Sequence, residues 1–358
     1  MRSRMPFAAR LDALSDRLEC PLLVTRAPNL QYLIGFTGSN GYLLVRPDGG
    51  GVFLTDGRYG ETAAARLRAV PGVSLEVYVG DLWKALGGVL GGLDRVGLEA
   101  DGVTWEFARH LREKTGLTPE AGPGILGDLR RSKDEAEIEA LRAAAAAGDA
   151  AFASLALLLG RAATESDLSW ELAAEMRRHG GERADWEPIV AAGAGASVPH
   201  YETGRVPLGA GLLLLDYGCL VDGYHSDMSR TVWLEGPPDP ALAQVHRVVV
   251  AAEEAGIAAC SPGATGHEVD EAARAVLRAA GHEEHFLHST GHGVGLEIHE
   301  PPWLRRGNED PLQVGDVVTV EPGVYLPGVG GVRVEDMVLI TASGPEVITG
   351  SHRELELT

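Results

Sequence analysis

Four carboxylates and one imidazole, set within apolar sequence, most constrain how this chain can fold. They are Asp216, Asp227, His292, Glu321 and Glu335, in the segments DYGCLVDGYHSD, GHGVGLEIHE, EPGVY and VRVED. Burying an unpaired carboxylate is costly, so the fold must supply these groups with partners. A mostly oxygen ligand set with four formal negative charges suits two divalent cations that share bridging carboxylates. The set therefore predicts a two-metal hydrolase site.

The first two aspartates lie in a predicted hairpin. The segment LLLLDYGCLVDGYHSDMSRTVWL favours two strands joined by Asp222-Gly223, a residue pair typical of type I′ turns. With that turn, Asp216 lies opposite Ser229, and Asp227 is two positions from Ser229, so both aspartates point to one face. Diagonal neighbours on one face are roughly 7–8 Å apart. That separation allows both carboxylates to reach a metal pair about 3.5–4 Å apart.

A simpler interpretation of this hairpin stays open. The two aspartates could face solvent or form an ion pair with Arg230, and bind no metal. His225 is adjacent to the two aspartates in sequence, and we exclude it from the ligand set.

A second predicted hairpin repeats this arrangement in VVTVEPGVYLPGVGGVRVEDMVLI. Glu321 ends an apolar strand, Glu335 lies in the return strand, and the two are symmetric about Gly328. The glycine-rich loop leaves the register open, so the sequence is compatible with a shared face but does not require it. Asp336 should point to the opposite face, because successive side chains of a strand alternate.

Several histidines accompany these hairpins. His288, His292 and His299 fall within FLHSTGHGVGLEIHEPP, and His200 precedes the first carboxylate strand in ASVPHYETG. A surface position is the alternative for each one. The segment GHGVG lacks the GxGxxG spacing of a dinucleotide loop, and prolines after His299-Glu300 exclude the helix of an HExxH zinc site. No GxSxG motif is present.

Composition limits the class of protein. A chain of 358 residues favours two domains. Its net charge of −20 argues against a nucleic-acid partner. Three scattered cysteines indicate a reducing compartment. Apolar runs are too short to span a bilayer, and the N-terminal segment 1–19 reads as an amphipathic helix without a signal core. We therefore expect a cytoplasmic protein that does not enter a membrane.

The predicted elements divide the chain near residue 131. Before it, strands at 21–25, 42–46, 51–55 and 73–79 alternate with helices at 59–68, 80–91 and 103–115, which predicts a small α/β domain. The Gly/Pro-rich stretch 121–127 ends this domain. Ser132 with Glu135 forms a capping-box pattern that opens an Ala-rich helix over 134–158.

The second domain contains a weak internal repeat. Thr164 and Asp167 recur as Thr265 and Glu268, 101 residues later, each after an Ala-rich helix and before acidic strands. Helix-capping rules alone could produce this similarity. The alternative is a duplicated unit with the active site between its halves.

At these motifs the sequence resembles the pita-bread metallopeptidases, in their aminopeptidase P and prolidase branch. DYG, SDMSRT, TGHGVGLEIHE, EPGVY and VRVED occur in the family's order and spacing, and NLQYLIGFTGSNGYLLV and LTDGRY extend the resemblance to the front half. The resemblance implies an α/β N-terminal domain over 1–131. It also implies an α+β pita-bread catalytic domain over 132–358 with a pseudo-twofold internal repeat.

The resemblance also implies a dinuclear centre, most often of manganese, with cobalt or zinc as other occupants. In it, Asp216 would chelate one ion, Asp227 and Glu335 would bridge both, His292 would bind the second, and Glu321 would complete the set. A hydroxide shared by the ions would attack the scissile carbonyl.

Further roles follow from the same resemblance. Glu321 would carry a proton to the leaving proline nitrogen, and Arg333 would organise the site. His200 and His299 would contact substrate or stabilise the tetrahedral intermediate. His288 is a candidate substrate-binding residue, with a hydrogen-bonded supporting residue as the alternative.

The substrate implied is a peptide with proline in second position. Aminopeptidase P is favoured over prolidase because no cation for a dipeptide's free carboxylate is evident, and Arg305 and Arg306 fit solvated surface. An inactive relative that serves as a binding protein is a remote alternative, since all five ligands are present. The family commonly forms homodimers through the N-terminal domain. The segment Asp56–Tyr59 would lie at that interface or form a local cap.

Overall fold

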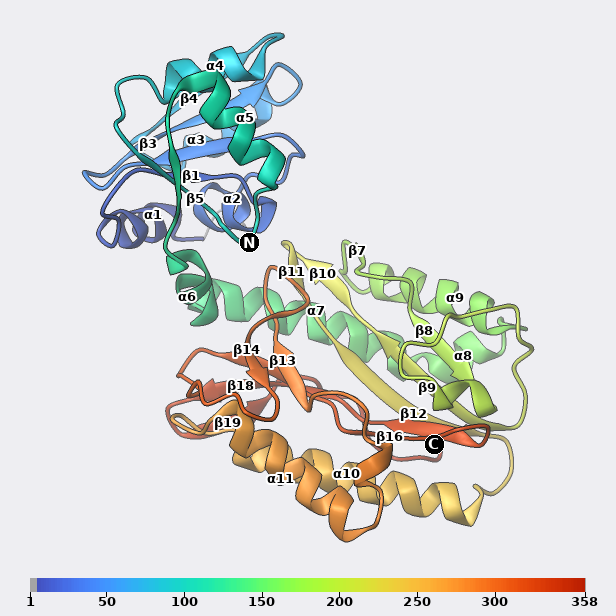
Figure 1. Ribbon diagram of the computed structural model, residues 1–358. Helices are drawn as coiled ribbons and strands as arrows, with labels where there is room; N and C mark the ends of the chain where they lie inside the picture. The colour runs from blue at the N-terminus through green and yellow to red at the C-terminus, as the bar shows by residue number, and fades with distance from the viewer. Residues whose placement is uncertain (1–4, 358) are drawn as a thin grey trace. The chain divides into compact units, whose positions relative to one another are not determined.

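A computed structural model describes residues 5–357 (Figure 1). The described chain separates into two compact units, of which the first ends at Arg130 and the second begins at Arg131. Residues 1–4 of the expected N-terminal helix lie outside the described residues, and a helix is present from Phe7 onward.

The first unit is built on a six-stranded mixed sheet with the order β4-β3-β2-β1-β5-β6. Its strands are β1 (Leu22–Val24), β2 (Tyr42–Val45), β3 (Gly51–Asp56), β4 (Val73–Tyr78), β5 (Val96–Leu98) and β6 (Pro119–Ala121). Its helices are α1 (Phe7–Ser15), α2 (Ala27–Ile34), α3 (Gly60–Leu67), α4 (Leu82–Val89), α5 (Trp105–Thr115) and α6 (Ile125–Arg131), the last ending one residue into the second unit. The strands and helices predicted between residues 21 and 115 are confirmed to within two residues, whereas the N-terminal helix ends at Ser15 and not at residue 19. Side-chain caps from Asp81 and Thr104 start α4 and α5 two residues later than predicted.

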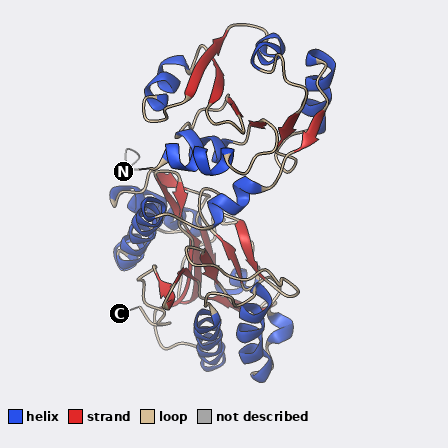
Figure 2. Ribbon diagram, turned by 90° about the vertical axis from the view of Figure 1, so that its left-hand side faces the viewer, coloured by secondary structure: helices blue, strands red, loops and turns tan. Residues whose placement is uncertain are grey.

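The second unit places strands between two groups of helices (Figures 1 and 2). The helices are α7 (Glu135–Ala153), α8 (Leu155–Leu159), α9 (Glu165–Arg178), α10 (Pro240–Ala259) and α11 (Gly266–Ala279). The first-half strands are β7 (Arg183–Ala184), β8 (Ile189–Ala192), β9 (Gly211–Tyr217), β10 (Cys219–Val221), β11 (Tyr224–His225) and β12 (Met228–Leu234). The second-half strands are β13 (Gly291–Gly293), β14 (Glu300–Leu304), β15 (Val317–Val320), β16 (Gly323–Leu326), β17 (Gly330–Arg333), β18 (Asp336–Thr341) and β19 (Gly344–Val347).

The two halves of this unit repeat one motif, as predicted. Helices α9 and α11 both begin with a complete capping box, formed by Thr164 with Asp167 and by Thr265 with Glu268. A long helix precedes each of them, α7 in the first half and α10 in the second. One apolar core joins α7–α9 to β8, β9 and β12, and others join α10 and α11 to second-half strands. The pita-bread architecture expected for this region is confirmed.

The long Ala-rich helix differs in detail from its prediction. Its capping box is formed by Asp134 and Glu137, whereas the Ser132 hydroxyl donates to the Val314 carbonyl at 3.0 Å. The helix ends at Ala153 and not at residue 158. There the Ser154 hydroxyl donates to the Ala150 carbonyl at 3.1 Å, and a separate short helix, α8, follows. A serine that bonds back to a carbonyl four residues earlier often bends a helix.

The first carboxylate hairpin has the predicted register. Asp216 pairs with Ser229, and Asp222 and Gly223 form the two-residue turn with φ of 52° and 83°. The ladders β9/β12 and β10/β11 keep the same register, which places Asp227 opposite Gly218 in the break between them. A Cβ at Gly218 would lie 1.8 Å from a backbone oxygen, so only glycine permits this close approach.

The second hairpin resolves the register that the sequence left open. Strand β16 pairs with β17 around Gly328, and β15 pairs with β18 so that Val320 lies opposite Asp336. Both ladders share one register, and Glu321 and Glu335 therefore lie opposite each other in the gap between them. Asp336 points away, as predicted, and accepts hydrogen bonds from Arg230 and Thr349 at 2.6 Å each.

Arg230 fixes the backbone behind these carboxylates, and its loss should destabilise the fold. Its buried guanidinium pairs with Asp336 and donates to the carbonyls of Ser229, Glu335 and Ser351. Breaking a buried ion pair by removing one partner typically costs about 3–5 kcal/mol. We expect Arg230→Leu to lower the free energy of unfolding by that amount in denaturant titrations. A loss below about 1 kcal/mol, the level of an exposed pair, would contradict this role.

Candidate metal centre

All nine side chains predicted to form the site line one pocket of the second unit, with a volume of about 560 Å³. They are His200, Asp216, Asp227, His288, His292, His299, Glu321, Arg333 and Glu335. Other residues that line it are Asp185, Trp186, Ile189, Pro199, Ser289, Ile298 and Trp303. Both halves of the repeat thus contribute to a single cavity.

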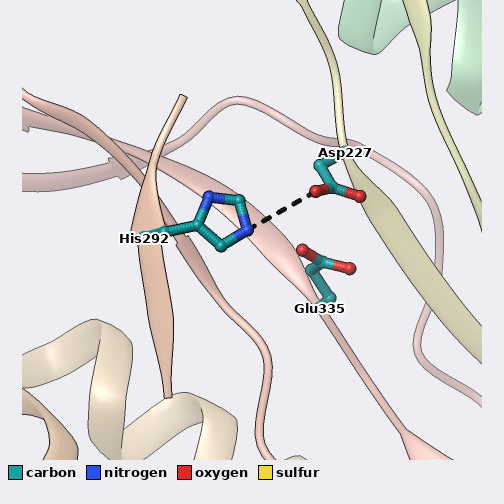
Figure 3. Close-up of side chains that lie close together, drawn as sticks. All are labelled: Asp227, His292 and Glu335. Carbon is teal, nitrogen blue, oxygen red and sulfur yellow. Dashed lines mark ion pairs between the residues drawn. The ribbon is translucent and has the colours of Figure 1, made fainter. Parts of the chain in front are cut away.

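Asp227, His292 and Glu335 form the centre of this arrangement (Figure 3). Each offers a ligand atom within 4.8 Å of the others, and all three residues are buried. The His292 Nδ1 atom bonds to the Gly293 carbonyl at 3.0 Å, so it carries the ring proton. Burial lowers the pKa of His292 to about 4 and keeps the ring neutral. The lone pair of Nε2, 3.7 Å from Asp227 Oδ2, is therefore free to bind a cation.

Glu321 and Asp216 line the same pocket as this cluster. Glu321 Oε1 lies 3.4 Å from His292 Nε2 and accepts from the Thr319 hydroxyl at 3.4 Å. Asp216 uses Oδ2 to pair with Arg333. The simpler interpretation of the first hairpin does not hold, because Arg230 pairs with Asp336 and both aspartates face the pocket.

These buried carboxylates repel one another when they are all ionised, unless a cation lies among them. Burial and then the neighbouring Glu335 raise the pKa of Asp227 and of Glu321 well above its usual range. Burial and then Asp216 raise the pKa of Glu335 to about 8. Buried like charges disfavour ionisation. Ionised carboxylates are therefore unfavourable in this cluster without a counter-charge, and the binding of cations is favourable.

Arg333 connects the ligand cluster to two side chains. It donates to the Ser229 hydroxyl and to the Tyr325 hydroxyl, each at 2.8 Å, besides pairing with Asp216. Tyr325 in turn lies 2.8 Å from His288 Nε2, and His288 Nδ1 bonds to a carbonyl at 2.9 Å. Both nitrogens of His288 are therefore engaged within the protein. Tyr325 could not be singled out from sequence, because nothing in EPGVY distinguishes it from any other strand aromatic.

His200 and His299 are the two exposed histidines of the pocket. Within residues 5–357, neither ring forms a hydrogen bond. The ring of His299 packs edge-on against His292, with 4.3 Å between centroids. Burial, then His200, lowers the pKa of His299. A neutral ring that faces the cavity with no fixed partner can donate to a bound molecule.

Comparison with known proteins identifies the family. Residues 139–342 match the model of metallopeptidase family M24, and residues 13–131 match the creatinase/prolidase N-terminal domain. The chain belongs to metallopeptidase family M24. This M24 chain is 36% identical to an uncharacterized peptidase of Bacillus subtilis, and the alignment covers 93% of this chain and 94% of that protein.

Solved structures agree with the M24 fold. The Xaa-Pro dipeptidase from Bacillus anthracis superposes with a TM-score of 0.91 and 33% identity, covering 99% of both chains. The X-Pro aminopeptidase from Thermotoga maritima superposes with a TM-score of 0.87 and 29% identity, covering 96% of this chain and 100% of that one. Among the described residues, no helix has the length and apolar character to cross a membrane.

The residues present fit the divalent ions that this metallopeptidase family implies. Asp216 Oδ1 and Glu335 Oε1 are buried without a hydrogen-bond partner among the described residues. Buried polar atoms of this kind need an explanation, and a bound ion is one. Carboxylate oxygens with one neutral imidazole are the donors that manganese and similar ions accept. The chemistry of the donor set thus agrees with the family.

Proposed function

We propose that this M24 chain is an Xaa-Pro aminopeptidase with a dinuclear centre held by Asp216, Asp227, His292, Glu321 and Glu335. The observation that supports it most is the convergence of all nine predicted side chains on one pocket, with unpartnered oxygens on Asp216 and Glu335. The proposal includes manganese as the preferred ion, with cobalt or zinc as substitutes. It also includes the division into domains at residues 131/132, a homodimer and a cytoplasmic location.

The protein's own groups would perform the proton transfers. When bound, the ions would supply Lewis acidity and acidify a water molecule. Glu321 lies next to the ligand cluster, and its raised pKa suits it to accept a proton and pass it to the leaving proline nitrogen. His200 and His299 would donate to the carbonyl oxygen as negative charge develops. Arg333 would hold Asp216 in place through their ion pair.

The pocket's charges favour peptides longer than a dipeptide. Among the described lining residues, Arg333 is the only lysine or arginine, and Asp216, Ser229 and Tyr325 already occupy its guanidinium. Arg305 lies over the ring of Trp303 at 5.8 Å and does not line the pocket. No permanent cation is therefore available within it for a dipeptide's free carboxylate. An aminopeptidase acting on Xaa-Pro-Yaa does not require one.

A panel of peptides tests this function. Chelator-treated protein should lose cleavage of Xaa-Pro-Yaa and regain it with Mn²⁺, while the dipeptide Xaa-Pro should be cleaved at least about tenfold more slowly at equal concentration, a difference of about 1.4 kcal/mol. Faster dipeptide cleavage would identify a prolidase, the activity named for the Bacillus anthracis relative. Absence of any Xaa-Pro cleavage with Mn²⁺, Co²⁺ or Zn²⁺ would refute the proposal and favour an inactive binding protein.

A further inference from the structure

One histidine near the pocket has no part in the function proposed above. His225 lies in β11 and is buried, and its Nδ1 atom is 2.5 Å from Asp185 Oδ2. Its Nε2 atom bonds to the Leu296 carbonyl at 3.1 Å, and its backbone N–H donates to the Gly295 carbonyl at 2.9 Å. A single residue thus contacts two consecutive carbonyls of the segment between β13 and β14.

The three contacts of His225 connect Asp185 to the carbonyls of Gly295 and Leu296. Its two ring nitrogens lie within hydrogen-bond distance of an Asp185 carboxylate oxygen and of the Leu296 carbonyl, so the ring bridges these two groups. Asp185 is itself held, because its backbone N–H donates to the Gly218 carbonyl at 3.0 Å. Gly218 lies in the first carboxylate hairpin, between Tyr217 and Cys219. The pair therefore joins that hairpin to the segment around Leu296.

The segment that His225 holds leads to His299. Its other end is fixed by Glu300, whose carboxylate bonds to the buried Lys133 ammonium at 2.8 Å. Ile298 and His299 lie between these two attachments, and both side chains line the pocket. A ring that must donate to a reacting oxygen needs to be held within about 0.5 Å of its working position. Two buried attachments on either side of His299 meet that need.

We propose that Asp185 and His225 are positioning residues that hold the 294–299 segment so that His299 faces the substrate. The inference rests on the role proposed for His299. His225 does not line the pocket, and the proposed role of the pair is to position His299. Neither residue was predicted from sequence, because they are 40 residues apart and belong to no shared pattern.

A double-mutant cycle tests the pair. His225→Ala should lower kcat for an Xaa-Pro-Yaa peptide by about 10- to 100-fold, the usual effect of removing a residue that orients a functional group, with metal content retained. In a His299→Ala background, adding His225→Ala should change kcat less than about twofold, because the group it positions is gone. Equal losses in both backgrounds, or loss of bound Mn²⁺, would overturn the inference.

A measurement independent of turnover separates this inference from the proposed function. Amide hydrogen exchange of residues 294–299 should accelerate by about tenfold or more in His225→Ala and in Asp185→Ala. His179→Ala is the control, because His179, the residue after α9, pairs with Glu175 at 3.2 Å and neither residue lines the pocket. Unchanged exchange in His225→Ala would refute the positioning role even in an active enzyme. If wild-type protein cleaves no peptide, only the proposed function fails, and the exchange result still decides whether the pair holds the segment.

Discussion

Replacing Glu335 with alanine is expected to abolish Xaa-Pro hydrolysis and remove at least one metal site while the protein stays folded. Glu335 lies beside Asp227 and His292, with one ligand atom of each within 4.8 Å of the others, and Ser229 donates to its Oε2 atom at 2.7 Å. Its other oxygen has no partner among the described residues and is the one available to an ion. Losing one preorganised electrostatic group typically costs about 10²–10³ in rate, and a shared ligand should cost at least the upper value.

The experiment compares kcat and metal content per chain. Glu335→Ala should bind fewer Mn²⁺ ions than wild type and show no more than about 10⁻³ of its kcat. Glu346→Ala is the matched control, because Glu346 is an exposed glutamate of β19 paired with Arg142. It should change kcat less than about twofold, since exposed pairs contribute little. Unchanged turnover in Glu335→Ala would refute a role for this carboxylate in metal binding.

Metal binding should stabilise the protein more as the pH rises. Without metal, the folded protein keeps a proton on Glu335 up to a pKa of about 8, whereas the unfolded chain releases it near the ordinary value of 4.5. The unfolded state therefore binds fewer protons between these limits, and the stability of metal-free protein falls as pH rises. The raised pKa values of Asp227 and Glu321 act in the same direction. Ions compete with those protons, so binding strengthens over the same range.

Thermal unfolding at several pH values measures this linkage. At one fixed free Mn²⁺ concentration, 100-fold above the Kd at pH 5, the metal should add about 2.7 kcal/mol of stability at pH 5 and more at higher pH. The difference in Tm between loaded and stripped protein should widen from pH 5 to pH 8. Groups outside the pocket titrate in both forms, so their effects cancel in that difference. A difference that narrows with rising pH would show that the buried carboxylates do not bind the ions.

Short-range patterns allowed much of the fold to be predicted. The Asp222-Gly223 turn sets the register that pairs Asp216 with Ser229, and alternation along the return strand places Asp336 away from Glu335. Capping geometry was less reliable, because adjacent acidic residues compete for one helix start. Asp134 with Glu137 satisfies the first turn of α7, and Ser132 bonds elsewhere.

Contacts between distant segments could not be predicted in the same way. Two examples are the hydrogen bond from Arg333 to Tyr325 and the pair formed by His225 and Asp185. Both depend on how separate segments pack together, and the periodicity of the sequence does not predict that packing. His225 lies two residues before Asp227, so strand alternation does not separate their faces, and no local pattern showed that the His225 ring would contact the Leu296 carbonyl.

The sequence by itself determined the types of donor atoms, the two hairpins that carry the four carboxylates, and the family, because each depends on residue identity and local spacing. Only the tertiary structure decided which atoms meet. It placed Glu321 opposite Glu335, directed His292 Nε2 toward Asp227, and left oxygens of Asp216 and Glu335 unpartnered among the described residues. The physical reason is that a buried carboxylate's partners come from strands far away in the chain, and packing both halves of the repeat around one cavity selects them.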